Sequence, residues 1–445
     1  MKTITVIALC MIGAAFFMPR TESDTPLTPA TVIDQVLIGN EQCPPFAASW
    51  PIKIGGVADD GVYAVAIDSA DNIVAAGATE STNWITGGYD TEYGGGVDGF
   101  VVKLSPEGAT LWSTYIGDDG EDWCYGVAVD ANDNVFVCGE SDSWTASTSG
   151  FIVKLSPAGA LLWRKTWNSY LDDTFIGIAV DSAGNVVVNG YSEFEWGNMG
   201  GLCVKYAADG VKLWQYSYGG YLYDDWGSGV ATDYVDNIIL TGTTNMGYWL
   251  GPYYANLDPF VIKLTPAGEF MWGYLAGAAY NETGRDVTVD ADGAVYITGE
   301  TMTPREGWHD KPTNDYEDKW DAYMLKLSPN GSYMWSGFIG TTLLDVGWGV
   351  AVQSDSTSSY GGDVVVVGET ATTPTGFTDT NAMIHISDRH GKRRRFTTWG
   401  GVGYQCARAV AYRGAGDLVV VGIDRGDGFV TVTDSRARKL KEKKK

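Results

Sequence analysis

One unit of four short apolar runs joined by tight turns recurs along most of the chain, at a spacing of roughly 50 to 60 residues. It is clearest between Asp122 and Trp163. The first run there alternates small and β-branched residues, which predicts a strand, and an Asp- and Asn-rich turn follows it. The third and fourth runs are joined by Ser-Pro-Ala-Gly, in which Pro fixes one φ angle and Gly supplies a left-handed position. Four strands repeated at this spacing are typical of the blades of a β-propeller.

Seven copies of the unit can be aligned on the residue that ends the first strand. That residue is Gln353 in the sixth copy and Tyr412 in the seventh, and in the first five copies it is Asp68, Asp130, Asp181, Asp233 and Asp290. A glycine, such as Gly77 or Gly139, is predicted to end each second strand. The third strands carry Lys103, Lys154, Lys205, Lys263 and Lys326, then His385. The fourth strands carry Trp112, Trp163, Trp214, Trp272 and Trp335, then Phe396. We interpret the lysines as buried-stem ion pairs or a solvated row, and the tryptophans as packing between blades.

The seventh copy stops after its third strand, within the segment DGFVTVTD. Its missing fourth strand matches the N-terminal segment from Ser49 to Gly56, where Trp50 aligns with Trp112. A ring closed in this way leaves no loose terminal sheet. We therefore predict an all-β fold, in which residues 48–434 form one seven-bladed β-propeller of four-stranded antiparallel blades and the N-terminal strand completes the last blade.

The repeat GIAVD-x-x-GN-V-x-V-x-G, followed by F-V-x-KL-x-x-x-G-x-x-x-W/Y, resembles the seven-bladed β-propeller (SBBP) repeat family of secreted and cell-surface prokaryotic proteins. The segment KLSPxGxxLW also gives a weaker likeness to the propeller repeats of pyrroloquinoline-quinone dehydrogenases. The SBBP family shares one fold but no single activity. The resemblance therefore implies an architecture and a secreted, cell-surface or periplasmic location, and it does not imply a particular chemistry.

Both ends of the chain differ from the repeats. Residues 1–20 contain Lys2 and an apolar run, which predicts a signal peptide or, if it is not cleaved, an N-terminal anchor and the one contact with a membrane. Residues 21–47 are predicted to be a leader or linker. The basic tail at 435–445 contains RARKLKEKKK, which is either a solvated end or a contact to an acidic surface such as a neighbouring copy.

The formal net charge of −25 excludes nucleic acids and anionic lipids as expected partners and favours basic ones. Cysteines are too few for a disulfide scaffold. Cys124 and Cys138 lie close together along a predicted hairpin, and Cys43 is expected near Cys406 where the ring closes. Either pair could be a disulfide or two buried free thiols.

Because the strands run up and down, the first-to-second and third-to-fourth turns must share one face of the ring, and the other connections must share the opposite face. The long irregular loops all lie on that second face, which we call the long-loop face: they are residues 78–97, 140–149, 191–199, 243–257, 300–320 and 369–380. Binding residues tend to lie in such loops on a rigid scaffold. We therefore expect a protein partner, or another copy of this chain, to contact the long-loop face.

A carboxylate stands eight residues before the aligned residue in six copies, and Tyr404 takes that place in the seventh. The six are Asp60, Asp122, Asp173, Asp225, Glu282 and Asp345. A ring of such acids would suit calcium, the one cofactor that this sequence suggests, although none is required. Alternatively, each acid ties its own loop by accepting backbone N–H bonds, and its repetition in nearly every blade favours this structural role.

Aromatic side chains concentrate in the predicted long loops. The candidate ligand-binding residues are Trp84, Trp144, Trp196, Tyr248, Trp249, Tyr253, Tyr254, Trp308, His309 and Trp320. Aromatic rings beside carboxylates suit sugar rings, but they suit protein contacts and loop packing equally well.

The sequence contains no nucleophile motif, no phosphate-binding loop and no metal-ligand spacing, and its histidines are only His309, His385 and His390. We therefore predict a non-enzymatic binding or structural propeller. The alternative is a glycan-binding protein or a carbohydrate-active hydrolase or lyase that uses the carboxylates and aromatics of the long-loop face.

Overall fold

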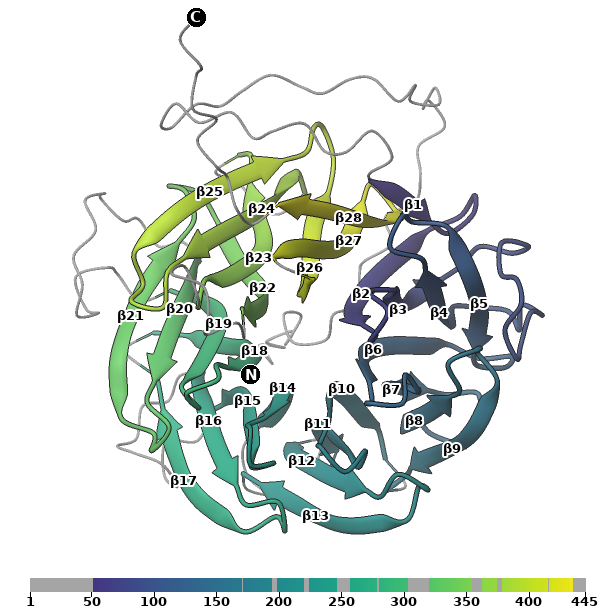
Figure 1. Ribbon diagram of the computed structural model, residues 1–445, viewed down its shortest axis with the longest axis horizontal. Coiled ribbons are helices and arrows are strands. Elements are labelled where there is room, and N and C mark those ends of the chain that lie inside the picture. The colour runs from purple at the N-terminus through teal and green to yellow at the C-terminus, as the bar shows by residue number, and fades with distance from the viewer. Residues whose placement is uncertain are drawn as a thin grey trace, which may run out of the picture.

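The computed structural model describes residues 51–169, 171–193, 198–219, 224–245, 257–277, 280–302, 320–353, 362–373, 378–414 and 416–434. Within these residues every regular element is a strand, and the strands form seven separate four-stranded sheets. The sheets are arranged as the blades of a ring (Figure 1). The predicted all-β, seven-bladed propeller is therefore confirmed. The segments predicted as signal peptide, leader and basic tail (1–20, 21–47 and 435–445) lie outside the described residues.

The strands of each blade follow one another from the channel outwards, and we call them a, b, c and d. Blade 1 contains β2 (Asp60–Ile67), β3 (Ile73–Thr79), β4 (Asp98–Leu104) and β5 (Thr110–Ile116). Blade 2 contains β6 (Asp122–Val129), β7 (Val135–Ser141), β8 (Ser149–Leu155) and β9 (Leu161–Trp167). Blade 3 contains β10 (Asp173–Val180), β11 (Val186–Glu193), β12 (Met199–Tyr206) and β13 (Lys212–Tyr218). Blade 4 contains β14 (Asp225–Thr232), β15 (Ile238–Thr244), β16 (Asp258–Leu264) and β17 (Phe270–Leu275).

Blade 5 contains β18 (Glu282–Val289), β19 (Val295–Thr301), β20 (Asp321–Leu327) and β21 (Tyr333–Ile339). Blade 6 contains β22 (Asp345–Val352), β23 (Val364–Ala371), β24 (Thr380–Ser387) and β25 (Arg393–Trp399). Blade 7 contains β26 (Gln405–Arg413), β27 (Asp417–Asp424), β28 (Asp427–Asp434) and, as its strand d, β1 (Ile52–Ile54). Each blade is antiparallel throughout.

The ring closes where the first and last strands of the chain meet, as the sequence predicts. Strand β1 pairs with β28 in antiparallel register, with Ile52 opposite Val430 and Ile54 opposite Gly428. In Figure 1 the purple start of the described chain accordingly lies beside its yellow end. Ile54 is buried in a cluster that joins blade 7 to blade 1. Non-covalent pairing therefore holds the two ends of the ring together.

A glycine recurs at the same position of strand b in every blade because the backbone of strand a lies very close to it there. A Cβ atom at Gly77 would lie 1.8 Å from the carbonyl oxygen of Gly61, and one at Gly139 would lie 1.7 Å from the carbonyl oxygen of Trp123. The prediction that this glycine ends strand b is wrong, since β3 continues to Thr79 and β7 continues to Ser141. Strand a begins at the buried acid, earlier than the apolar pattern indicates. Strand b therefore continues past the glycine and pairs with these first residues of strand a.

The repeated Lys and Trp fasten each blade to the next one. In blade 1, Lys103 forms a buried ion pair with Asp68 (Nζ to Oδ2, 2.8 Å). Lys103 Nζ and Trp112 Nε1 both donate to the carbonyl oxygen of Pro157, in the c–d turn of blade 2 (3.3 and 3.0 Å). Blades 2 to 5 repeat this three-part contact on the carbonyl oxygens of Ala208, Pro266, Pro329 and Arg389. The interpretations of the lysines as ion-paired and of the tryptophans as packing between blades are confirmed.

The degenerate seventh blade makes the same type of contact with a different side chain. Arg413, at the end of β26, donates from Nη1 to the carbonyl oxygen of Pro106 in the c–d turn of blade 1 (2.7 Å). The fastening between neighbouring blades is thus kept across the closure of the ring.

The cysteines of the described residues are free. Cys124, Cys138, Cys203 and Cys406 are all buried thiols. Cys43 lies outside the described residues. A search of the described residues for a helix long and apolar enough to cross a membrane finds none.

Candidate functional site

The predicted acidic ring occupies the first position of strand a in six blades. All six side chains are fully buried: Asp60, Asp122, Asp173, Asp225, Glu282 and Asp345. In blade 1, Asp60 Oδ2 accepts the backbone N–H of Gly56 and the hydroxyl of Ser81, both at 2.9 Å. Its Oδ1 accepts the hydroxyl of Thr79. The carboxylate therefore joins the d–a loop to the end of strand b.

The residue opposite each of these acids on strand b carries a hydroxyl group. The pairs are Asp60 with Thr79, Asp122 with Ser141, Asp173 with Ser192, Asp225 with Thr244, Glu282 with Thr301 and Asp345 with Thr370. In blade 7 the sequence predicted Tyr404 at this place, and the structure corrects it to Gln405, because Arg413 and not Tyr412 stands where Asp68 stands in blade 1. Gln405 Oε1 accepts the N–H of Gly401 (3.0 Å), as Asp60 does for Gly56.

Burial dominates the electrostatics of these acids. It raises the pKa of Asp60 to about 6 and also raises the pKa of Asp122 and Asp173, against the opposing effect of their hydroxyl donors. Among the described residues, no group of three or more His, Cys, Asp and Glu side chains is arranged to hold a metal ion. The contacts of the acids are those of loop anchors, and calcium binding stays a prediction.

Seven of the ten candidate ligand-binding residues lie outside the described residues: Trp196, Tyr248, Trp249, Tyr253, Tyr254, Trp308 and His309. The indole of Trp84 packs edge-on against Phe100 (5.0 Å between centroids) and donates to Thr79 Oγ1. Trp144 packs edge-on against its own strand c, donates to Asp118 Oδ2 (2.7 Å), and has one ring face covered by Arg164 (4.0 Å).

Trp320 is half-buried, and its carbonyl oxygen accepts the N–H of Asp345 (2.8 Å). The structure therefore does not bring Trp84, Trp144 and Trp320 together into one exposed aromatic surface.

The long loop of blade 1 is built onto the outer edge of its own blade. Thr86 and Asp90 accept backbone N–H bonds from Ser113 (2.7 Å) and Tyr115 (3.0 Å) of β5. Residues 86–90 therefore extend the blade at its outer edge.

The central channel contains a ring of side chains that the sequence analysis missed. Each strand a is interrupted by a β-bulge at the same place, and the extra residue of the bulge lines the channel. The seven bulge residues, in blade order, are Tyr63, Tyr125, Ile176, Ser228, Arg285, Trp348 and Arg408. These seven residues differ in charge, polarity and size from blade to blade, and a ligand site is expected to break the symmetry of the ring in this manner.

Three consecutive bulge residues, from blades 5 to 7, form a stack of alternating charge and aromatic surface. The guanidinium carbon atoms of Arg285 and Arg408 lie 4.3 and 3.9 Å from the centre of the Trp348 ring. Contacts of this kind are stabilised by the ring quadrupole, more strongly where water is excluded. The stack places two cations in the wall of the channel of a strongly acidic protein.

Three glutamates behind the ring each contact one of its members. Glu300 forms a two-point ion pair with Arg285 (Nη2 to Oε1, 2.6 Å; Nε to Oε2, 3.1 Å). Glu369 Oε1 accepts from Trp348 Nε1 (2.9 Å), and Glu140 Oε1 accepts from the hydroxyl of Tyr125 (2.8 Å).

These three glutamates occupy equivalent positions, each directly after the close-approach glycine of strand b. Where the bulge residue is Ile176 or Ser228, the equivalent residue is Tyr191 or Thr243. Each glutamate therefore lies behind a bulge residue that has a polar hydrogen, and it holds that side chain in place, as supporting residues do in a binding site.

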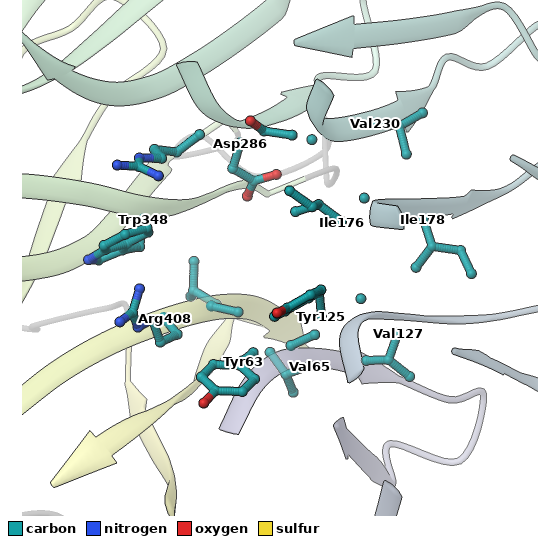
Figure 2. A pocket seen from close by; sticks show the side chains of 18 of the residues that line it. Tyr63, Val65, Tyr125, Val127, Ile176, Ile178, Val230, Asp286, Trp348 and Arg408 are labelled. Carbon is teal, nitrogen blue, oxygen red and sulfur yellow. The ribbon is translucent and has the colours of Figure 1, made fainter. Parts of the chain in front are cut away.

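The ring opens into a cavity of about 230 Å³ in the centre of the propeller. Figure 2 shows Trp348 and Arg408 on one side of this cavity and Val127, Ile178 and Val230 on the other. Asp286 lines the cavity in blade 5, at a position where the other blades have Gly or Ala. The cavity is therefore amphipathic, with guanidinium groups facing hydrocarbon.

The sequence carries a signal for this ring. In six blades the bulge residue stands five positions before the aligned residue, and in the seventh the same spacing runs from Arg408 to Arg413, the residue that takes the place of Asp68 there. Comparing the repeats position by position would have shown two Tyr, two Arg, one Ile, one Ser and one Trp at this place, directly before the mostly small and apolar second half of the strand.

Comparison with known proteins identifies the repeat. A family model described as a beta-propeller repeat (SBBP) matches residues 111–143, which confirms the resemblance stated from the sequence. No curated protein matches the chain. A catalytically inactive virginiamycin B lyase from Staphylococcus aureus, solved with quinupristin, has 12% identity and a TM-score of 0.51, and the match covers 86% of this chain and 98% of that one.

Two further solved structures have lower TM-scores. An ulvan lyase from a polysaccharide lyase family has 10% identity and a TM-score of 0.48, over 86% of this chain and 96% of that one. Extracellular domains of Drosophila semaphorin 1b have 8% identity and a TM-score of 0.46, over 87% of this chain and 86% of that one. At such identities the likeness shows the propeller fold alone, and it does not distinguish catalysis from binding.

Proposed function

We propose that this propeller of SBBP-type repeats is a non-enzymatic binding module, secreted or held at the cell surface, whose long-loop face contacts a basic protein surface. The contact is either with a separate basic partner or with another copy of the chain through its basic tail. The location is inferred from the apolar N-terminal segment and from the resemblance to secreted propellers.

One observation carries the proposal: a group of acids gathers on the long-loop face of blades 1 and 2, in the residues next to the ends of their strands. We call this group the acidic rim, and it consists of Asp59, Glu80, Asp118, Glu121 and Asp142. Glu80 N donates to the carbonyl oxygen of Asp59 (2.9 Å), and Asp142 N donates to that of Glu121 (3.2 Å), so the loops hold these acids in place.

The acids of the rim repel one another. Burial, followed by the charges of Asp59 and Glu121, raises the pKa of Glu80. Among the described residues, Glu80, Asp118, Glu121 and Asp142 form no ion pair with a Lys or Arg side chain. A basic partner would relieve this repulsion, and such contacts raise association rates and depend strongly on salt.

The experiment compares the association state of the chain by sedimentation velocity at about 0.01 M and about 0.5 M salt, where charge screening differs greatly. Removing residues 436–445 is expected to abolish association at low salt. The double variant Glu121→Gln/Asp142→Asn should weaken it to a similar degree. The matched control, Asp209→Asn/Glu269→Gln, removes the same charge from exposed c–d turns on the opposite face and should leave association unchanged.

Association that survives both the tail deletion and the rim variant would contradict self-association through this face. Calcium is tested in the same experiment by adding it to each sample. The alternative function is tested by a glycan array with a parallel assay for released reducing ends. Specific glycan retention, or cleavage, would replace the protein-contact proposal with the carbohydrate one.

A further inference from the structure

We propose that the channel cavity binds a small organic carboxylate, with Arg408 as the residue that receives its acid group. This site is distinct from the acidic rim and does not depend on the proposal made for it. The inference rests on a comparison of two arginines that occupy equivalent positions in the same ring.

Arg285 and Arg408 are the bulge residues of β18 and β26, and both stack on Trp348. Arg285 has its own counter-ion, because Glu300 lies behind it on strand b and forms a two-point ion pair. The equivalent residue behind Arg408 is Ile423. Blade 7 has therefore kept the cation and lacks the carboxylate that neutralises it in blade 5.

The protein satisfies the guanidinium of Arg408 only in part. Its Nη2 donates to the hydroxyl of Tyr404 (3.0 Å), and its Nε is buried without a hydrogen-bond partner among the described residues. No carboxylate oxygen of the described residues forms an ion pair with it within 4.0 Å. Arg408 is partly exposed to the channel, and no carboxylate of the described residues lies at ion-pair distance from it, so this position is suited to an anion that enters the cavity from outside.

The charge of Glu369 acts on Arg408, but one oxygen of this carboxylate already accepts hydrogen bonds from two other side chains. Glu369 Oε1 accepts from Trp348 Nε1 (2.9 Å) and from the hydroxyl of Tyr404 (3.4 Å). Burial raises the pKa of Glu369, while Arg408 lowers it. Glu369 thus holds Trp348 and Tyr404 in position around Arg408 instead of forming a direct ion pair with it.

The remaining lining and the volume of the cavity indicate the polarity and size of the part of the ligand that carries the acid group. On the side opposite Trp348 and Arg408 the side chains of Val127, Ile178 and Val230 present hydrocarbon to the cavity (Figure 2). A volume of about 230 Å³ is below that of sites for drug-sized molecules, so the ligand is small. An acid group on an apolar body matches both walls of the cavity.

Asp286 discriminates between anions. Its two oxygens accept the N–H groups of Val287 (2.8 Å) and Val350 (2.9 Å), and burial raises its pKa to about 6. At neutral pH this carboxylate would repel a doubly charged anion more than a singly charged one. A monocarboxylate is therefore favoured over inorganic phosphate or sulfate.

The test is isothermal titration calorimetry of the full chain with sodium benzoate, compared with benzyl alcohol, inorganic phosphate and sulfate. We expect benzoate to bind and to raise the melting temperature of the protein, since a ligand that binds only the folded state stabilises it. Benzyl alcohol has the same ring without the charge and should not bind measurably.

Two variants test the role of Arg408. Ile423→Glu gives blade 7 the carboxylate that blade 5 has, so it should neutralise Arg408 inside the protein and weaken benzoate binding by at least about tenfold. Arg408→Gln should have the same effect if it folds. Lys53→Gln removes a half-exposed cation of β1 and should leave binding unchanged.

Three results would overturn the proposal. The first is a folded native protein that does not bind benzoate. The second is a folded Ile423→Glu variant that binds benzoate as tightly as the native protein. The third is equal affinity for phosphate and benzoate, which would show an anion site without selection for an organic body.

Discussion

Lys103 connects two blades through one ammonium group. It pairs with Asp68 of its own blade and donates to the carbonyl oxygen of Pro157 in the next, and its side chain is only 5% exposed. Buried pairs of this kind have a large desolvation cost, so their removal as a pair can be tolerated, whereas removal of one partner leaves an uncompensated charge.

We therefore predict that Lys103→Met lowers the free energy of unfolding by roughly 3 to 5 kcal/mol, because Asp68 remains buried and charged. Urea-induced unfolding followed by tryptophan fluorescence measures the loss. The double variant Asp68→Asn/Lys103→Met should recover part of it, since no unpaired carboxylate is left.

The control for this prediction is the exposed ion pair of Arg389 with Asp292 (3.7 Å; side chains 52% and 79% exposed). Asp292→Asn should change stability by less than about 1 kcal/mol. An equal loss in the buried and the exposed variants would contradict the role given to the buried pair.

Buried acids near the long-loop face should make stability depend on pH. Burial, and then the charge of Asp122 of the next blade, raises the pKa of Asp98 to about 7. Burial, and then Glu282, raises the pKa of Asp258 to about 7 as well. Between pH 4 and 7 the folded state thus binds protons that the unfolded state has lost, so stability falls as the pH rises through this range.

The ion-paired acids act in the opposite direction. Hydrogen bonds from Lys103 and Asn72 outweigh burial at Asp68 and lower its pKa, and Asp181 and Asp233 behave in the same way. The stability that these pairs supply is present above the ordinary Asp pKa of 3.8 and is lost as the pH falls through their lowered values. The two effects together place the maximum of stability in the mildly acidic range.

We accordingly predict a higher melting temperature at pH 5 than at pH 8, measured by scanning calorimetry in buffers of equal ionic strength. Asp98→Asn keeps the shape of the side chain and removes its charge, so it should flatten this slope. Glu107→Gln, in an exposed c–d turn, should leave the slope as it is. A melting temperature that rises from pH 5 to pH 8 would show that the buried acids do not control the pH dependence.

At the scale of the strand, two local features shape each blade. The β-bulge of strand a turns one residue per blade towards the channel, and the close-approach glycine of strand b makes room for it. The c–d turn contributes a second glycine, which packs on the tryptophan of the preceding blade. Gly159, for example, has a φ of +81°, and a Cβ atom there would lie 2.7 Å from Trp112.

Gly159→Ala should therefore destabilise the protein for two reasons, the left-handed backbone and the contact with Trp112, by roughly 2 to 4 kcal/mol in total. Gly184→Ala is the matched control, because Gly184 has a φ of +79° in an a–b turn and its nearest Cβ contact is an ordinary 3.8 Å. It should lose only the backbone part, roughly 1 to 2 kcal/mol. Equal losses in urea unfolding would remove the contribution assigned to the contact between blades.

At the scale of the whole molecule, stability depends on closure of the ring by β1. Deleting residues 51–56 would leave β28 as an open edge next to buried apolar residues of blades 7 and 1. We predict a lower melting temperature and self-association, measured by calorimetry and by light scattering after gel filtration. An added peptide SWPIKIGGV should reverse both by strand addition.

The peptide control carries Asp in place of Ile54, which is 4% exposed in the native protein, and it should not rescue the deletion variant. A deletion variant that stays monomeric and melts at the native temperature would show that the ring is stable without β1, the outer strand of blade 7.

From the sequence alone it is possible to predict the number of blades, their four strands, the turn chemistry and the closure by the N-terminal strand. These features are local and repeated. The glycine of strand b recurs in all seven copies, and the Asp after strand a and the Trp of strand d each recur in five, which distinguishes the pattern from chance. The repeated lysine predicted an ion pair as one of two alternatives, and the structure supplied Asp68 as the partner of Lys103.

Which side chains meet in the channel becomes visible only in the folded ring. Arg285, Trp348 and Arg408 come from three strands far apart in the chain, and the bulge that turns them inwards arises from pairing between strands a and b. Arg285 has an internal counter-ion and Arg408 does not, because Glu300 in blade 5 is replaced by Ile423 in blade 7. Both of these residues lie on strand b, and their distance along the sequence from the arginine does not reveal the contact. Contacts between distant segments depend on register and burial, and a single sequence does not display either quantity directly.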